Sequence, residues 1–204
     1  MPSDVVVLRG VVMWSLVGVS LCLSLSCKSS SEKTGAEDRV QRGAYLISIL
    51  ACDDCHSPKV FTEQGPRPDP ELRMSGHHGG TDLAAVPDGM IGPDRWGALT
   101  SNDMTVWVGP WGTTFAINLT PHPDGLGLWT EDQFVHAIRT GRHLGVGRPI
   151  LPPMPWPAYA HLSDEDLRAI FAYLRTLPPV ANVVPQPLPP QLATNTPSPE
   201  PSHP

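Results

Sequence analysis

Cysteine is scarce in this chain, which has four cysteines among 204 residues. Cys52 and Cys55 form one C-x-x-C pair, and the sequence holds no second pair of that kind. Because a structural zinc site commonly takes four ligands from two such pairs, the sequence argues against structural zinc. Cys22 lies inside an apolar N-terminal stretch and Cys27 ends it, so no pair remains for a structural disulfide.

Basic charge and alternating strand patterns are also scarce. The formal net charge is −6, which argues against a nucleic-acid partner, because nucleic acid selects basic patches. Few β-branched residues alternate with polar ones, so a sheet protein is not expected. Proline and glycine are abundant instead, at 25 and 18 residues, and they predict long irregular connections. An acidic surface suits a redox partner with a basic docking face.

The segment Cys52-Asp53-Asp54-Cys55-His56 has the C-x-x-C-H pattern typical of covalent haem attachment. Two thiols one helical turn apart can add to the two vinyl groups of one porphyrin, and His56 then lies under the iron as its proximal ligand. A redox C-x-x-C of the thioredoxin type would need a strand and a βαβ context, which this sequence lacks. We therefore expect one covalent haem c, held by Cys52, Cys55 and His56.

An export signal is expected at the N-terminus, over residues 1–26. Residues 10–26 carry no charge, are rich in Val and Leu, and follow Arg9, as in the apolar core of a secretory signal. The residues before Cys27 resemble a bacterial lipoprotein cleavage site, which makes Cys27 the predicted lipid anchor, with a flexible linker over 27–37. An uncleaved membrane anchor and a cleaved soluble protein are the alternatives. All three place the folded domain on the periplasmic side of the cell envelope.

The helical spacing of apolar residues predicts three main helices. The first covers residues 38–52. The second covers residues 131–140, begins with a capping box and ends at Gly141. The third covers residues 164–177, has Ser163 as its N-cap, and ends before two consecutive prolines.

The predicted haem domain covers residues 38–178. Between its first two helices lies a long irregular stretch, residues 57–130, which is dense in Gly, Pro and Asp. From 179 to 204 the chain is proline-rich with few apolar side chains, and such a segment cannot bury enough surface to offset its ordering, so we expect a disordered tail. Some tryptophans of the long stretch are expected to pack over a haem edge, among them Trp96, Trp107 and Trp111.

A proline-rich segment, residues 151–157, bears the expected distal ligand of the iron. It has four prolines in seven positions, which restrict the backbone to few extended conformers. Because a thioether is a weak ligand, a rigid backbone is a physical means of keeping it in place, and Met154 is therefore the expected ligand. Competing side chains are Met74, Met90, Met104, His122, His136, His143, His161 and the adjacent pair His77-His78, which is the strongest of the histidines.

Four segments of the chain resemble the single-haem c-type cytochromes of the class I fold and, more closely, the haem domains of cytochrome subunits of membrane-bound alcohol and sugar dehydrogenases. The resemblance implies an all-α, class I cytochrome c-like fold with three main helices around one haem. It also implies His56 and Met154 as the axial ligands, and a crossing of the first and third helices at Gly43, with Tyr173 or Phe171 in the contact. The segments are Arg42–Leu46 before the haem motif, Asn118–Pro121 with Gly125–Thr130, Pro152–Pro155, and Leu162–Leu167 running into Ala172–Arg175.

The chain departs from those subunits in two ways. They carry several haem motifs, whereas this chain has one. The insert over residues 57–114 is longer than a minimal cytochrome requires. The resemblance therefore implies the type of haem domain without implying a particular dehydrogenase partner.

One-electron transfer is the expected function, and it requires no catalytic residues. The iron would cycle between its ferrous and ferric states, and redox partner proteins, a dehydrogenase or a terminal oxidase, would deliver and remove the electron. One alternative is a haem enzyme with an open sixth coordination site, such as a peroxidase. The other is a haem-based gas or redox sensor, which would need an output domain.

Overall fold

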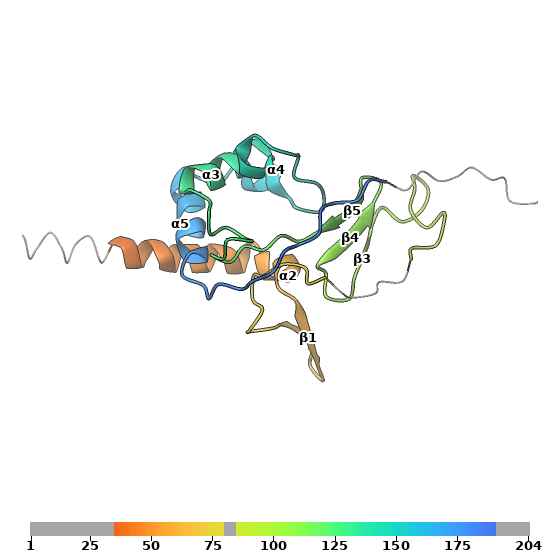
Figure 1. The fold of residues 1–204 in the computed structure, drawn as a ribbon, viewed down its shortest axis with the longest axis horizontal. Helices are drawn as coiled ribbons and strands as arrows, with labels where there is room; N and C mark the ends of the chain where they lie inside the picture. Colours follow the sequence, from red (N-terminus) through yellow and green to blue (C-terminus); the bar gives the residue numbers. More distant parts are fainter. Residues whose placement is uncertain (1–34, 80–84, 191–204) are drawn as a thin grey trace, which may run out of the picture.

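A computed structural model describes residues 35–79 and 85–190 (Figure 1). One helix covers residues 35–49. Helix α5 stands across it, α3 and α4 lie above, the three-stranded sheet lies toward the other end of the molecule, and the hairpin that contains β1 projects below the middle. The remaining helices are α2 (Cys52–His56), α3 (Glu131–Thr140), the 3-10 turn η1 (His143–Gly145), α4 (Trp156–Tyr159) and α5 (Asp164–Leu174). Over the two described ranges, no helix has both the length and the apolar character that crossing a membrane requires.

The second predicted helix is confirmed at both ends. The helix α3 has the predicted bounds, and Thr130 and Gln133 exchange the two hydrogen bonds of a capping box at its start. At its end, Gly141 takes a left-handed backbone with a φ of 63°. Glycine adopts this conformation at little cost because it has no Cβ atom.

The other two predicted helices end earlier than expected. The Ser163 hydroxyl caps α5 as predicted, but the helix ends at Leu174, three residues short of the expected end. The first helix ends at residue 49 instead of 52. Ala51 then takes a left-handed backbone with a φ of 55°, which interrupts the helix. The C-x-x-C-H motif therefore forms a short helix of its own, α2.

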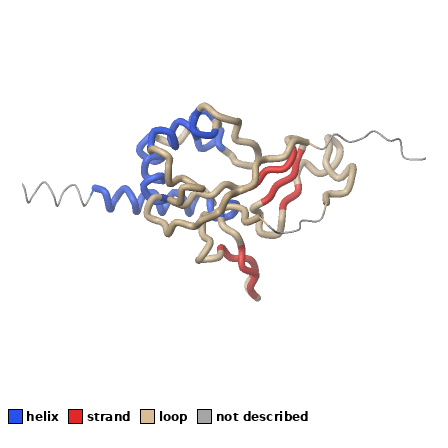
Figure 2. The backbone as a smooth tube through the Cα atoms, viewed as in Figure 1, coloured by secondary structure: helices blue, strands red, loops and turns tan. Residues whose placement is uncertain are grey.

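The expectation of an all-α domain is wrong for the segment between α2 and α3, because this mostly helical domain also has two small sheets. Strands of two to four residues are too short to show the alternation by which a strand is recognised in a sequence. Figure 2 shows the strands within the loop-rich part of the chain, separate from the helices. One sheet is the antiparallel hairpin of β1 (Lys59–Thr62) and β2 (Gly65–Pro68), and the other has the antiparallel order β3 (Leu99–Thr100), β4 (Val106–Gly109) and β5 (Gly112–Phe115).

The N-terminal helix and α5 cross at Gly43, as the resemblance implied. A Cβ atom at this position would clash with the carbonyl group of Ala169 and would lie 2.8 Å from the Cβ of Tyr173. The two backbones can therefore pass so closely only because residue 43 has no side chain. Phe171 packs elsewhere, against Phe134 of α3, with ring centroids 5.4 Å apart. The helices share one apolar core, which includes Leu46, Ile47, Leu126, Ile138, Leu167, Ile170 and Leu174.

Residues 178–190, here called the C-terminal strap, run from the end of α5 to β5 (dark blue in Figure 1). Two asparagine side chains fasten the first part of the strap. The Asn118 amide donates a hydrogen bond to the Val180 carbonyl at 2.9 Å. The Asn182 amide donates to the Ser75 carbonyl at 2.8 Å. The strap is therefore held to two loops that are distant in sequence.

The second part of the strap pairs with β5. The N–H of Thr113 donates to the carbonyl of Leu188 at 2.9 Å, and the N–H of Leu188 donates back to the carbonyl of Thr113 at 2.9 Å. Residues 179–190 are therefore held in place by these contacts, whereas disorder was expected from residue 179 to 204. A segment that is held by backbone hydrogen bonds needs little apolar surface of its own, so a composition poor in apolar residues did not indicate that it is ordered. Residues 191–204 lie outside the described part of the chain.

Candidate haem site

The helix α2 is fixed to the loop that follows it through Asp53. The Arg73 guanidinium pairs with the Asp53 carboxylate at 2.7 Å, and the Ser57 hydroxyl donates to the same carboxylate at 2.7 Å. The Ser57 oxygen in turn accepts a hydrogen bond from the N–H of Met74 at 2.9 Å. Burial alone would raise the pKa of Asp53, but hydrogen bonds from Arg73 and Ser57 outweigh burial and lower it. The Asp53 carboxylate therefore faces the loop after α2, and the two cysteines take no part in these contacts.

His56 is buried at the end of α2, with 9% of its surface exposed. Its Nδ1 lies 2.8 Å from the carbonyl oxygen of Ile117. Burial lowers the pKa of His56 and outweighs the opposing effect of this hydrogen bond, so the imidazole is neutral at pH 7. Since the carbonyl can only accept, Nδ1 carries the proton, and Nε2 keeps its lone pair free for a metal.

The two thiols of α2 are protonated at neutral pH. Burial, followed by the negative charge of Asp53, raises the pKa of Cys52 to about 12. Burial also raises the pKa of Cys55. Redox-active cysteines of the thioredoxin type have a lowered pKa, because the thiolate is the nucleophile. The electrostatics of α2 therefore argue against a disulfide-exchange site.

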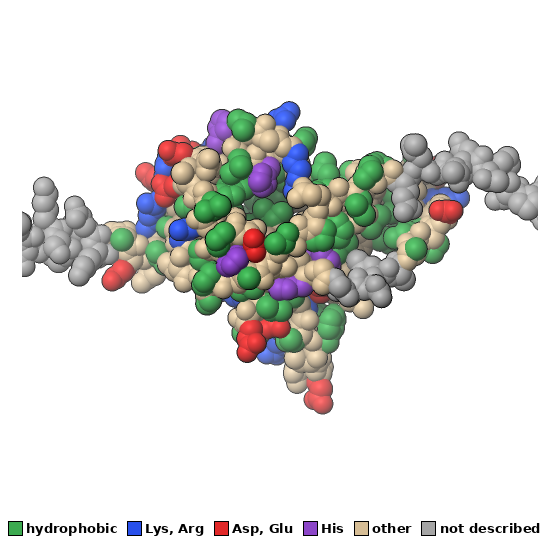
Figure 3. Space-filling model, in the orientation of Figure 1, with side chains coloured by type: hydrophobic (Ala, Val, Ile, Leu, Met, Phe, Trp, Pro, Cys, Tyr) green, Lys and Arg blue, Asp and Glu red, His purple; other side chains and the backbone are tan. Residues whose placement is uncertain are grey.

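An apolar cavity opens beside α2 and is bounded by all the main helices. The space between its atoms, including the part open to solvent, is about 1360 Å³. In the space-filling view the surface is hollowed below the lobe that carries α3 and α4, and hydrophobic side chains are visible inside (Figure 3). The apolar lining includes Ile47, Leu50, Ile117, Leu119, Leu126, Phe134, Ile138, Leu167, Ile170 and Leu174.

The cavity brings together the side chains that the sequence singled out. Cys52, Cys55, His56 and Met154 all line it, although Met154 is about 100 residues away from the others in the sequence. Of the methionines in residues 35–79 and 85–190, only Met154 is part of the lining. The other three take different places: Met74 is fully buried in the core, while Met90 and Met104 lie outside the cavity.

The strongest competing histidines do not reach the cavity lining. The Nδ1 of His77 is 2.9 Å from the hydroxyl of Thr105, and the Nε2 of His78 is 2.8 Å from the hydroxyl of Ser75. His143 does line the cavity, stacked edge-on against Trp129 with ring centroids 4.9 Å apart.

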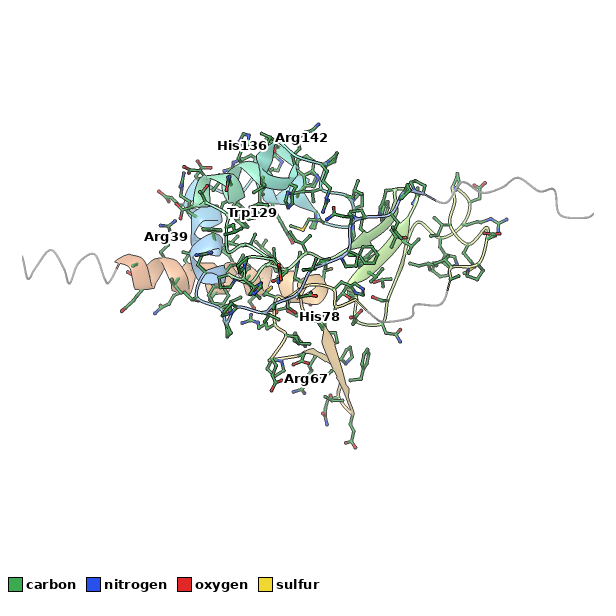
Figure 4. All side chains as sticks on the ribbon, viewed as in Figure 1. Arg39, Arg67, His78, Trp129, His136 and Arg142 are labelled. Carbon is green, nitrogen blue, oxygen red and sulfur yellow. The ribbon has the colours of Figure 1, made fainter. Side chains whose placement is uncertain are left out.

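Several lining residues carry no sequence signal and were missed. Tyr159 donates a hydrogen bond from its hydroxyl to the Leu50 carbonyl at 2.7 Å, which closes one wall next to α2. Figure 4 shows Trp129 within the body of the molecule beside α5 and Arg142 at the outer surface. Of the tryptophans expected near a haem, Trp107 lines the cavity, whereas Trp96 is 63% exposed. The missed lining residues are Thr114, Trp129, Arg148 and Tyr159.

The residues of this cavity fit a c-type haem. The apolar walls match a porphyrin, and α2 offers two thiols and an imidazole nitrogen. Arg148 also lines the cavity, and its guanidinium pairs with no carboxylate of the described residues. Burial lowers the pKa of Arg148, because its charge is partly removed from water. A haem propionate would supply the negative charge that complements it.

The predictions for the N-terminus cannot be located in the structure. The export signal over residues 1–26, the lipid anchor Cys27 and most of the linker over 27–37 fall outside the described residues.

Comparison with known proteins also points to a c-type cytochrome, although no protein-family profile matches the chain. The chain is 25% identical over 170 residues to the cytochrome c subunit of the quinone-dependent alcohol dehydrogenase of Gluconobacter oxydans (strain 621H), which is 82% of this chain and 28% of that subunit. It is 29% identical over 160 residues to the gluconate 2-dehydrogenase cytochrome c subunit of Pantoea cypripedii, which is 78% of this chain and 28% of that subunit.

A shorter and more similar match is the fructose dehydrogenase cytochrome subunit of Gluconobacter japonicus, 38% identical over 68 residues, or 33% of this chain and 14% of that subunit. The chain thus spans less than a third of the length of these relatives. Over most of its own length it is homologous to the cytochrome c subunits of alcohol and sugar dehydrogenases, and it is a c-type cytochrome.

Proposed function

We propose that this chain transfers single electrons through one covalently bound haem c with His56 and Met154 as axial ligands. The observation that carries the proposal is the convergence of the C-x-x-C-H helix and Met154 on one apolar cavity. Bound there, the haem would supply an iron that cycles between its ferrous and ferric states. Cys52 and Cys55 would hold it through thioether bonds.

The protein's own groups would fix the ligands and exclude water. The carbonyl of Ile117 holds the His56 ring by its Nδ1, which orients the other nitrogen and raises its basicity. Met154 offers a thioether, and His/Met ligation raises a haem potential relative to two histidines. Arg148 would pair with a propionate, and the apolar lining would keep the local dielectric low.

Dehydrogenases are the partners we propose for this electron carrier. The relatives are named as cytochrome subunits of dehydrogenases that act on alcohol, gluconate and fructose, and the same role is proposed for this chain toward a partner dehydrogenase. We also propose export, with a lipid on Cys27 or an N-terminal anchor holding the domain at the periplasmic side of a membrane. Mass spectrometry of the mature N-terminus would detect a diacyl-modified Cys27.

An optical and potentiometric titration of the matured full-length protein tests the proposal. We expect one haem per chain by mass, one reversible one-electron wave, and a far-red iron–sulfur absorption band in the oxidised protein. Met154→Ala should abolish that band while the haem stays attached. A band that persists in this variant would show that Met154 is not the ligand. Rapid stoichiometric binding of carbon monoxide to the reduced wild-type protein would favour an open sixth site and an enzyme instead.

A further inference from the structure

The segment that bears Met154 has very few hydrogen bonds to the rest of the protein. Residues 152, 153 and 155 are prolines, which have no N–H to donate. Among the described residues, a single hydrogen bond reaches residues 151–154. It is donated by the hydroxyl of Thr114 to the carbonyl oxygen of Pro152, with the two oxygens 2.9 Å apart.

Thr114 is well placed to control this loop. It lies in β5 with 8% of its surface exposed, and it lines the same cavity as Met154. A hydrogen bond formed away from water is costly to lose, because the acceptor is then left without a partner. The carbonyl that Thr114 holds is two residues before the thioether, so its position sets where the loop passes over the cavity.

The strand that carries Thr114 is itself held by hydrogen bonds along both of its edges. Thr113 exchanges two backbone hydrogen bonds with Leu188 of the C-terminal strap, so β5 has a bonded neighbour on each edge, β4 and the strap. Gly112 begins the strand with a φ of +102°, and the strap passes so close to it that a Cβ atom there would clash with the Leu188 carbonyl. The donor is therefore presented from a supported strand instead of a free loop, which is how precise positioning is achieved.

We propose that Thr114 is the positioning residue of the distal ligand: its hydroxyl fixes the Pro152 carbonyl and thereby holds the Met154 thioether over the haem. This inference rests on the proposed function, in which Met154 is the distal ligand. It also gives the segment 57–114 a role, since its last strand supports the ligand loop from outside the helical part of the domain.

The test is a pH titration of the iron–sulfur band in the oxidised full-length holoprotein. Thr114→Val keeps the shape of the side chain but removes the donor. We expect the band to be present at neutral pH and to be lost on alkalinisation with a midpoint about one pH unit below that of the wild type, which corresponds to a roughly tenfold weaker hold on the thioether. Thr114→Ser, which restores the hydroxyl, should return the midpoint close to the wild-type value.

A matched control comes from the same sheet. The Thr100 hydroxyl donates to the Val106 carbonyl at 2.9 Å and lies outside the cavity lining, so Thr100→Val removes a similar bond at a distance from the ligand. Its midpoint should equal that of the wild type. If Thr114→Val does not mature, Thr114→Ala replaces it, with the same expected shift and the same rescue by serine.

The outcomes separate this inference from the proposed function. An unchanged midpoint in Thr114→Val, together with loss of the band in Met154→Ala, overturns the positioning role and leaves the ligand assignment intact. Equal shifts in the valine and serine variants also overturn it, because packing and not the hydroxyl would then hold the loop. A band that survives in Met154→Ala removes the ligand assignment first, and the positioning role with it.

Discussion

The two sides of the cavity hold their candidate ligands in different ways. His56 is one residue from Cys55, belongs to a helix, and has its Nδ1 fixed by the carbonyl of Ile117 at 2.8 Å. Met154 lies on a non-helical, half-buried loop, and the only hydrogen bond that reaches the adjacent backbone in the described residues comes from Thr114. The proximal ligand is therefore held by a hydrogen bond to its own ring and by a helix that it shares with the cysteines, whereas the distal ligand depends on one hydrogen bond to the backbone of its loop.

This difference indicates where the protein can change without unfolding. The proximal histidine shares its helix with the two cysteines and with Asp53, so its loss would affect attachment as well as ligation. We expect a change in the distal loop to leave the packing of α2, α3 and α5 in place, because one hydrogen bond reaches that loop in the described residues. The following predictions test that division, starting with the largest expected effect.

Replacement of His56 by alanine should nearly abolish the mature protein, because it removes the imidazole at the attachment helix. We expect the yield of covalent haem protein to fall by more than about tenfold, in line with the loss of metal binding when ligands or their supports are removed. The measurement is haem absorbance per mass of purified chain. Met154→Ala is the matched distal variant and should keep its haem. Equal losses in both variants would contradict the proposed division of roles.

Gly43→Ala should destabilise the helical side, because the added methyl group meets the backbone carbonyl of Ala169. Overpacking of this kind costs about 1–3 kcal/mol in unfolding free energy, and we expect the upper end because a backbone atom cannot move aside as a side chain can. Denaturant unfolding of the holoprotein measures this loss of unfolding free energy. Gly35→Ala is the control, since Gly35 lies in the same helix with no other atoms within 4 Å of the added carbon.

Gly112→Ala should weaken the distal side through the strap. Two glycines share nearly the same backbone, Gly112 with a φ of +102° and Gly65 with +103°, so alanine at either one costs about 1–3 kcal/mol of backbone strain. Only at Gly112 does the new carbon also meet the strap, at the Leu188 carbonyl. We expect the loss of unfolding free energy to be about 1 kcal/mol larger at position 112 than at 65. Equal losses of unfolding free energy at positions 112 and 65 would mean that contact with the strap does not stabilise β5.

Removal of the Asp53 charge should have the smallest effect, and it should depend on pH. The pKa of Asp53 in the folded protein lies below its ordinary value, so the ionised carboxylate stabilises the fold above about pH 4. That stabilisation is lost as the pH falls through the lower folded-state value. Asp53→Asn should cost about 1 kcal/mol at pH 7 and progressively less under more acidic conditions. Urea unfolding at several pH values measures this trend.

The neighbouring carboxylate provides the control for that experiment. Asp54 is on the same helix but forms no ion pair within the described residues. Asp54→Asn should therefore cost less unfolding free energy at pH 7 than Asp53→Asn does. A similar change in both variants would mean that the net charge of α2, and not the Arg73 pair, is responsible.

The sequence predicted those parts of the structure that depend on neighbouring residues. The capping box at Thr130 and the glycine at position 141 set the two ends of α3 through contacts between residues that are close in the sequence. The C-x-x-C-H motif is likewise a local pattern, and the four proline positions around Met154 restrict the backbone without help from elsewhere. The rest of the candidate site was not predictable in this way.

Contacts between distant segments explain what the sequence did not reveal. Thr114 is one hydroxyl in a four-residue strand, and nothing in its local sequence indicates a bond to residue 152. Arg148 is one of several arginines, and only the fold places it against the cavity. The strap was taken for a disordered tail because its composition is poor in apolar residues, yet the side chains of Asn118 and Asn182 fasten it through polar contacts.

The position of the strap in the chain also sets an order of events. A protein is made from its N-terminus, so the attachment helix, the ligand loop and α5 all precede residues 178–190. Of the described residues, the segment that pairs with β5 at Leu188 is thus the last to be made. Until then, the strand carrying Thr114 has a free edge, and the cavity has not acquired its final wall at Pro187. The strap therefore completes the pairing of β5 and adds one wall of the cavity only after every other element in the described residues has been made.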